Sequence, residues 1–305
     1  MWARGFKDGK QIPVESIVQE EFKDIYHNFG YKEAILQDPT SLSYMVAPSD
    51  DMWLLMIDSN LYFDGEGMPT NRGIISTETL EWIKTCSDLA KEKDAQIITV
   101  MHHNLLKHSE KMSDGNTLDN SGEAIALFKE LDLNIVLSGH IHIQNIAVDN
   151  NDHTNITEIV TSSLSVYPQQ YGVIDYSKSS GFNYNTAKVK VDEWARKQNI
   201  EDENLINFAE YSRSTFYKQP YSRAYYSLEE NGGYNEKEMD QMSEIVGILN
   251  LAYFEGNLFK IKDDIINLPF YKLILETDSD YVYDFVYSMI FSSLRDNSSI
   301  HIPAK

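Results

Sequence analysis

A chain of 305 residues, 42% of them hydrophobic and 12% aromatic, can bury sizeable cores. This composition excludes a disordered protein and makes two domains the expectation. With 47 acidic against 26 basic residues the net charge is −21, which repels a phosphate backbone and so excludes a partner that is a nucleic-acid polymer. The sequence contains no run of eighteen apolar residues, so we predict no transmembrane segment.

The first predicted elements are a helix and a hairpin. Ser16 and Gln19 form a capping box ahead of apolar residues that recur on one helical face, which predicts a helix over about 17–29. Two apolar stretches, 43–47 and 52–57, flank a Pro-Ser-Asp turn and are typical of paired strands.

The middle of the chain alternates helices and strands. In chain order these run over about 77–93, 97–100, 122–131 and 135–137. Thr77 is the predicted cap of the first helix, and the single cysteine, Cys86, lies in its apolar pattern as a core residue. One cysteine allows no intrachain disulfide. A strand, a helix and a further strand in succession predict an α/β fold.

Histidines follow both of the predicted core strands. A His-His-Asn run at 102–104 comes directly after strand 97–100, and a Gly-His-Ile-His turn at 139–142 comes after strand 135–137. The ends of neighbouring core strands are where α/β sheets build their sites, and neutral imidazole is a good metal ligand. The glycine of the turn lets the backbone bend where a side chain would clash. Ordinary polar loop residues are the alternative, but a second histidine pair at an adjacent strand favours a metal centre. Its predicted ligands are His102, His140 and His142, and helix 17–29 is expected to pack near its entrance.

The two residues after His102 have two possible roles. As substrate-binding residues, His103 and Asn104 would orient the substrate or hydrogen-bond a phosphoryl oxygen. The alternative is that they hold the loop together and support the neighbouring ligands.

At these residues the chain resembles the calcineurin-like metallophosphoesterases, over about 1–190. In that family a histidine ending one strand, here His102, and a Gly-His-x-His turn, here 139–142, supply three ligands of a two-metal site. The resemblance implies that His102 and His140 bind one metal and His142 the other. It also implies divalent Mn, Fe or Zn as the cofactor, two ions in a complete site, and a small phosphoester as the substrate.

The chain departs from this family in one half of the site. The family's Asp-x-His, Gly-Asp and Gly-Asn-His-Asp motifs are absent, and the four loop aspartates lack the required neighbours; they are Asp58, Asp64, Asp114 and Asp119. We therefore expect an N-terminally truncated chain, completed by an upstream segment or by self-association, and we assign no catalytic residue. The opening Trp-Ala-Arg-Gly-Phe at 2–6 and the helical tail suggest the subgroup likened to cyclic-nucleotide phosphodiesterases.

The second half of the chain changes character near residue 191. Four strands of a second sheet are predicted over 145–148, 155–161, 171–176 and 182–191. Beyond them the apolar spacing is helical, with Pro220 interrupting a helix. The predicted fold is an incomplete two-sheet α/β/β/α sandwich over 1–191, followed by a smaller all-helical domain over 192–305.

The sequence thus predicts a metal-dependent phosphoesterase that hydrolyses phosphodiesters weakly or not at all as this chain. Two other functions stay open: a non-catalytic scaffold that keeps fold and partner contacts, and a protein that binds a single metal ion. The sequence as given has no basic and hydrophobic leader, so a cytoplasmic location is expected. A missing N-terminal segment with a signal would instead imply secretion or a lipid anchor.

Overall fold

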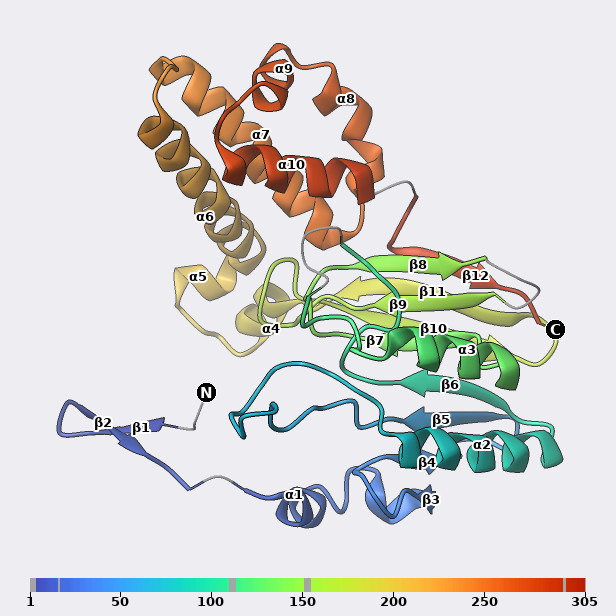
Figure 1. Cartoon of the computed structure of the whole chain (residues 1–305). Helices are drawn as coiled ribbons and strands as arrows, with labels where there is room; N and C mark the ends of the chain where they lie inside the picture. Colours follow the sequence, from blue (N-terminus) through green and yellow to red (C-terminus); the bar gives the residue numbers. More distant parts are fainter. Residues whose placement is uncertain (1–3, 16, 110–113, 151–154, 293–294, 305) are drawn as a thin grey trace. The chain divides into compact units, whose positions relative to one another are not determined.

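The computed structural model of this chain is a mixed α/β protein with a seven-stranded sheet, a smaller three-stranded sheet and a C-terminal helical region (Figure 1). It describes residues 4–15, 17–109, 114–150, 155–292 and 295–304. Two compact units divide the chain: the first contains 1–107, 114–140 and 147–158, and the second contains 108–113, 141–146 and 159–305. The predicted α/β class is confirmed.

The large sheet has parallel strands at its centre. Its seven strands are β3 (Ala34–Gln37), β4 (Tyr44–Val46), β5 (Met52–Met56), β6 (Gln96–Val100), β7 (Ile135–Ser138), β8 (Asn145–Asp149) and β9 (Ile156–Val160). They lie in the order β3-β4-β5-β6-β7-β9-β8. The predicted hairpin is present as the antiparallel pair β4 and β5, whereas β5, β6 and β7 pair in parallel. The carboxyl ends of β6 and β7 therefore open on the same edge of the sheet.

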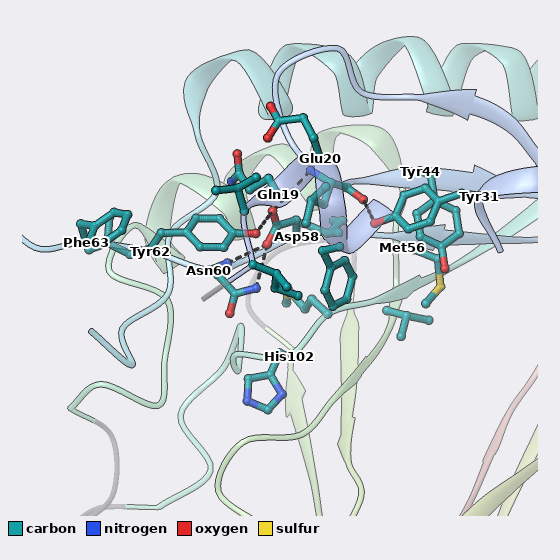
Figure 2. A pocket seen from close by; sticks show the side chains of 18 of the residues that line it. Gln19, Glu20, Tyr31, Tyr44, Met56, Asp58, Asn60, Tyr62, Phe63 and His102 are labelled. Carbon is teal, nitrogen blue, oxygen red and sulfur yellow. Dashed lines mark hydrogen bonds between the residues drawn. The ribbon is translucent and has the colours of Figure 1, made fainter. Parts of the chain in front are cut away.

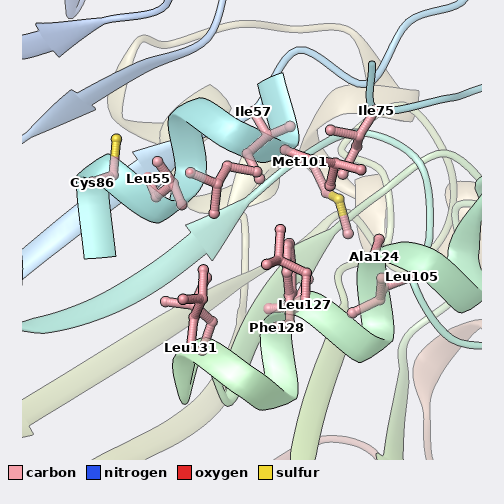
Figure 3. Close-up of a cluster of buried hydrophobic side chains, with 14 of the residues drawn as sticks. Leu55, Ile57, Ile75, Cys86, Met101, Leu105, Ala124, Leu127, Phe128 and Leu131 are labelled. Atoms are coloured by element: carbon pink, nitrogen blue, oxygen red, sulfur yellow. The ribbon is translucent and has the colours of Figure 1, made fainter. Parts of the chain in front are cut away.

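Two helices pack on this sheet and form the core of the first unit. Helices α2 (Thr77–Glu92) and α3 (Ser121–Leu131) bury Cys86, Phe128 and their neighbours against β5, as Figure 3 shows. Cys86 is fully buried, as predicted for a core residue. The cap of α2 is one residue earlier than predicted: the Ser76 hydroxyl accepts the backbone N–H of Thr79 at 3.1 Å.

The N-terminal segment differs from its prediction. An unpredicted hairpin, β1 (Arg4–Lys7) with β2 (Lys10–Pro13), turns through Asp8 and Gly9, both with positive φ. An Asp-Gly pair is a strong hairpin signal, so the sequence did carry this information.

Helix α1 spans only Gln19–Ile25, shorter than the predicted 17–29. Ser16, its predicted cap, lies outside the described residues. The backbone N–H of Val18 donates to the Glu21 carboxylate at 2.9 Å instead, and this contact fixes the start of the helix.

The three-stranded sheet belongs to the second unit and corrects two predictions. Its strands are β10 (Gln170–Ser177), β11 (Gly181–Lys188) and β12 (Ser299–Ile302), all antiparallel. The predicted strands near 145 and 155 are present as β8 and β9, but they join the large sheet, because side-chain alternation does not specify which sheet a strand joins. Strand β12 was not predicted, so 192–305 is not helical throughout.

Helices make up most of the rest of the second unit. They are α4 (Val191–Lys197), α5 (Glu203–Ile206), α6 (Phe208–Asn231), α7 (Glu236–Glu255), η2 (Leu258–Lys260), α8 (Lys262–Ile266), α9 (Pro269–Leu275) and α10 (Asp280–Ser292). Pro220 does not interrupt a helix, because α6 runs through it. The lost backbone hydrogen bond is offset by packing, since buried residues such as Leu228 lie in a shared core with α7 and α10.

The helical core also includes residues that come much earlier in the sequence. Ile141, Ile143 and Val160 are buried in the same cluster as Leu228. For this reason the second compact unit includes segments that precede residue 191 in the sequence. The domain boundary predicted at residue 191 stays a prediction. No helix in the described part of the chain has the length and apolar character needed to span a bilayer.

Candidate metal centre

Two of the three predicted metal ligands lie side by side. His102 directly follows the loop residue after β6, and His140 follows β7 by two residues. His102 Nε2 lies 2.8 Å from His140 Nδ1, and the two rings are nearly perpendicular, at 89°. His140 has a φ of +66°, a left-handed conformation that few non-glycine residues adopt. The ends of parallel strands therefore bring together two imidazoles separated by 37 residues of sequence.

The glycine of the turn has a role different from the predicted one. Gly139 is not among the residues with positive φ, whereas His140 and His142 both are. The backbone N–H of Gly139 instead donates to the His102 carbonyl at 3.0 Å. A Cβ on Gly139 would lie 3.7 Å from His102 Nδ1, an ordinary contact distance, so the predicted clash is absent. The two histidines, rather than the glycine, have the unusual backbone conformation of this turn.

His142, the third predicted ligand, is exposed and lies in the second unit. Among the residues that the structure describes, no group of three or more His, Cys, Asp or Glu side chains is arranged to hold a metal ion. The nitrogens of His102 and His140 are close enough to reach one ion, because Zn–N bonds are about 2.0–2.1 Å long. The described residues thus fit one metal ion in part: the two nitrogens form a hydrogen bond in which one carries the proton, and both would be donors only where an ion replaced that proton. Metal binding by His142 stays a prediction.

His103 is held with both ring nitrogens engaged. Its Nε2 lies 3.0 Å from the Asn71 carbonyl oxygen, which can only accept, so Nε2 carries the proton. Its Nδ1, 2.9 Å from the Ser59 hydroxyl, therefore accepts from it. Burial lowers the pKa of His103 below its ordinary value, which keeps the ring neutral.

The backbone of Gly73 makes room for this ring. A Cβ at residue 73 would lie 2.2 Å from Cγ of His103, so any side chain there would overlap the imidazole. Arg72, next to it, donates to both carboxylate oxygens of Asp119 and to Asp114. These contacts fix the segment that carries the Asn71 carbonyl.

Asn104 is buried and connects the loops after β6 and β7. Its side-chain N–H groups donate to the Ser138 hydroxyl at 3.0 Å and to the Gly139 carbonyl at 3.1 Å. Its backbone bonds to Asn116 and Leu118 on both sides. Together with the engaged ring of His103, this geometry favours the loop-holding alternative, and substrate contact by either residue stays a prediction.

Sequence reasoning missed the residue that joins these loops, Glu158 on β9. Its carboxylate is fully buried and accepts from the backbone N–H groups of Leu105 and Leu106 and from the Ser138 hydroxyl. A single acidic residue inside the apolar run Ile-Thr-Glu-Ile-Val was the available signal, because a buried carboxylate needs specific partners.

The four loop aspartates have structural partners. Asp114 and Asp119 bind Arg72. Asp64 accepts the backbone N–H groups of its own turn. Asp58 accepts from the backbone of Leu42, from Tyr62 and twice from Asn60, which uses the four acceptor positions of a carboxylate.

A pocket of about 1010 Å³ lies beside His102 in the first unit (Figure 2). Its floor is formed by the ends of β5 and β6, and α1 supplies one wall. The aromatic residues that line it are Phe22, Tyr31, Tyr44, Tyr62 and Phe63. Burial, with the charge of Asp58 nearby, raises the pKa of Tyr31 to about 12, so its hydroxyl is protonated at neutral pH and donates to the Leu42 carbonyl.

Residues 190–296 match the family model of the C-terminal domain of cyclic nucleotide phosphodiesterase. Among solved structures, a dimetal phosphatase from Danio rerio is similar at 10% identity and a TM-score of 0.39, over 48% of this chain and 57% of that chain. The chain therefore spans less than two thirds of that structure's length. No curated protein matches the sequence. Residues 190–296 are therefore similar to the C-terminal domain of cyclic nucleotide phosphodiesterase, which agrees with the resemblance that the histidine motifs and the helical tail suggested.

Proposed function

We propose that this chain is a metal-dependent phosphoesterase that acts on small phosphodiesters. We expect it to hydrolyse them slowly. The observation that carries the proposal is the 2.8 Å approach of His102 Nε2 to His140 Nδ1 at the carboxyl ends of two parallel strands. The match of residues 190–296 to a domain of cyclic nucleotide phosphodiesterase supports it.

His102 and His140 would hold the metal ion; the resemblance assigns His142 to the second ion that a complete site would contain. A divalent ion at this place would polarise a phosphoryl oxygen of the substrate. The protein's own part is to orient the two donors. Asn104 and Glu158 fix the loops that carry them, and the Gly139 N–H holds the backbone of His102.

Weak activity follows from the charge of the donor set. Two-metal phosphoesterases hold their ions about 3.5–4 Å apart, and anionic ligands are needed to offset the repulsion between dications at that distance. His102 and His140 are neutral donors, and the carboxylates around them are engaged elsewhere: Asp58 in its turn, Asp119 with Arg72. We therefore propose one weakly held ion of Mn, Fe or Zn.

The test combines metal titration with hydrolysis of bis-p-nitrophenyl phosphate. The purified chain is expected to bind about one Mn²⁺ or Zn²⁺ ion, and to hydrolyse the diester slowly and only with metal present. His102→Ala and His140→Ala should each abolish both signals. His27→Ala, which removes an exposed histidine on the segment after α1, should leave both unchanged.

Two results would contradict the proposal. Metal binding that persists in both histidine variants would remove the assigned centre. Rapid hydrolysis of the diester by the unmodified chain would show that the metal site has ligands besides His102 and His140.

A second function is favoured by the same pair of histidines. A protein that binds a single metal ion needs only convergent donors, and the described residues supply two. One ion held by His102 and His140 without any hydrolysis of the diester would support this alternative over the phosphoesterase.

A further inference from the structure

We propose that the pocket beside His102 binds a planar aromatic ring, and that this ring is the organic group of the phosphoester substrate. The first part concerns the pocket alone, whereas the second rests on the proposed phosphoesterase function. The pocket lies within the first unit and extends from α1 to the end of β6.

The walls of the pocket suit a flat, apolar group. Five aromatic side chains line it, and its floor is apolar, with Met56, Ile57, Val100 and Met101 at the strand ends. At about 1010 Å³ the pocket has the size of an organic-ligand site rather than of an ion site. Aromatic side chains pack favourably on the edges and faces of another ring.

Charge places the phosphate outside the pocket. None of the described residues that line it is a lysine or an arginine, while Glu20 and Asp58 are acidic. An anionic phosphoryl group inside would be repelled and would lose its hydration without compensation. His102 lies at the border of the pocket, so a phosphoryl group beside the histidine pair leaves the organic group to enter it.

Hydrogen bonds within the protein disfavour a sugar or another polyhydroxyl group. The Tyr31 hydroxyl donates to the Leu42 carbonyl, and the Tyr62 hydroxyl donates to Asp58. The Asn60 amide also donates to Asp58, whose acceptor positions are filled. A ligand rich in hydroxyls would lose its bonds to water and find these polar groups already paired.

The wall formed by α1 faces the pocket together with the segment after β5. Gln19 on α1 and Tyr62 on the segment after β5 both line the pocket. Phe22, one turn further along α1, and Phe63 on the loop are both partly exposed, at 36% and 52%. Each can therefore be truncated with little effect on the core.

The test measures binding of 2-naphthol to the full chain in the presence of a chelator, by the change in naphthol fluorescence. This probe is a neutral aromatic alcohol, so binding does not depend on metal or on hydrolysis. Phe22→Ala and Phe63→Ala should each weaken binding about fivefold or more, as expected for loss of one stacking partner. Decahydro-2-naphthol, the saturated and non-planar alcohol with the same number of carbons, should compete poorly.

Two matched variants act as controls. Phe29→Ala removes a 75% exposed aromatic residue of the same N-terminal segment that does not line the pocket, and it should leave binding unchanged. His140→Ala removes half of the histidine pair but no lining residue, and it should also leave naphthol binding unchanged. Failure of the metal centre therefore does not affect this readout.

Three results would overturn the inference. The first is unchanged naphthol binding in both Phe22→Ala and Phe63→Ala. These residues lie on different elements, so if one variant misfolds the other still tests the pocket. The second is equal loss in Phe29→Ala, which indicates non-specific association. The third is competition by decahydro-2-naphthol as strong as that by naphthol itself.

Discussion

Single buried polar side chains fix the segments around the candidate centre. Asp38, just after β3, is 3% exposed and accepts hydrogen bonds from Thr79 on α2, from Ser41 and from Thr40. Burial alone would raise the pKa of this carboxyl, but these hydrogen bonds outweigh it, and the pKa lies below its ordinary value. The charged form of Asp38 therefore stabilises the folded state.

This predicts a pH-dependent effect of Asp38→Asn. Because the folded pKa is lower than the unfolded value of about 3.9, the stabilisation is present above that value and is lost as pH falls through the folded pKa. We expect the variant to lose about 1–3 kcal/mol of unfolding free energy at neutral pH. Urea denaturation should show the difference from the parent chain shrinking in acid.

The control is Asp50→Asn, which changes an exposed carboxyl in the turn before β5 and should have little effect at either pH. A loss in Asp38→Asn that stays constant from neutral pH into acid would contradict the role given to the charge.

At the scale of elements, the carboxyl ends of β6 and β7 are joined by a third strand. Glu158 on β9 accepts two backbone N–H groups of the loop after β6 and the hydroxyl of Ser138 at the end of β7. One buried carboxylate thus fixes both segments that carry the histidines. The positions of His102 and His140 depend on this contact as well as on the strands.

We therefore expect Glu158→Gln to reduce both stability and metal affinity. Glutamine keeps the shape but removes the charge and turns one acceptor into a donor that faces other donors, at a cost of about 1.5–3 kcal/mol. Chemical denaturation and metal titration of the same sample should show the two losses together.

Glu81→Gln, in an exposed pair with Lys84 on α2, is the matched control and should change stability by less than about 1 kcal/mol. If Glu158→Gln loses stability but binds metal like the parent chain, the carboxylate supports the fold without positioning the histidines.

At the scale of the whole molecule, each compact unit has a core of its own. Phe128 on α3 is fully buried in the cluster beneath α2 and the large sheet, and Leu228 on α6 is fully buried among the C-terminal helices. The two clusters share no residue. Because the cores are separate, we expect a substitution in one core to destabilise first the unit that contains it.

Phe128→Ala and Leu228→Ala should each remove about 2–5 kcal/mol from the local core. Hydrogen exchange followed by mass spectrometry should show faster exchange in α2 and α3 for the first variant, and in α7 and α10 for the second. Equal acceleration throughout the chain in both variants would show a single cooperative unit instead.

The sequence by itself determined the helices and strands that have strong periodicity and the motifs at their ends. Strands β5, β6 and β7, helices α2 and α3 and the burial of Cys86 all follow from local apolar spacing. The juxtaposition of His102 and His140 follows as well, because parallel neighbouring strands end on one edge.

Only the tertiary structure decided which strands pair with each other and which groups the polar side chains contact. Which sheet β8 joins, the pairing of β12 with β11, and the continuity of α6 through Pro220 all depend on contacts between residues far apart in sequence. The engaged ring of His103 and the central contact of Glu158 depend on such contacts too. Periodicity reports which face of an element is buried, but not the element that buries it, and a polar side chain shows its role only once its partner is in place.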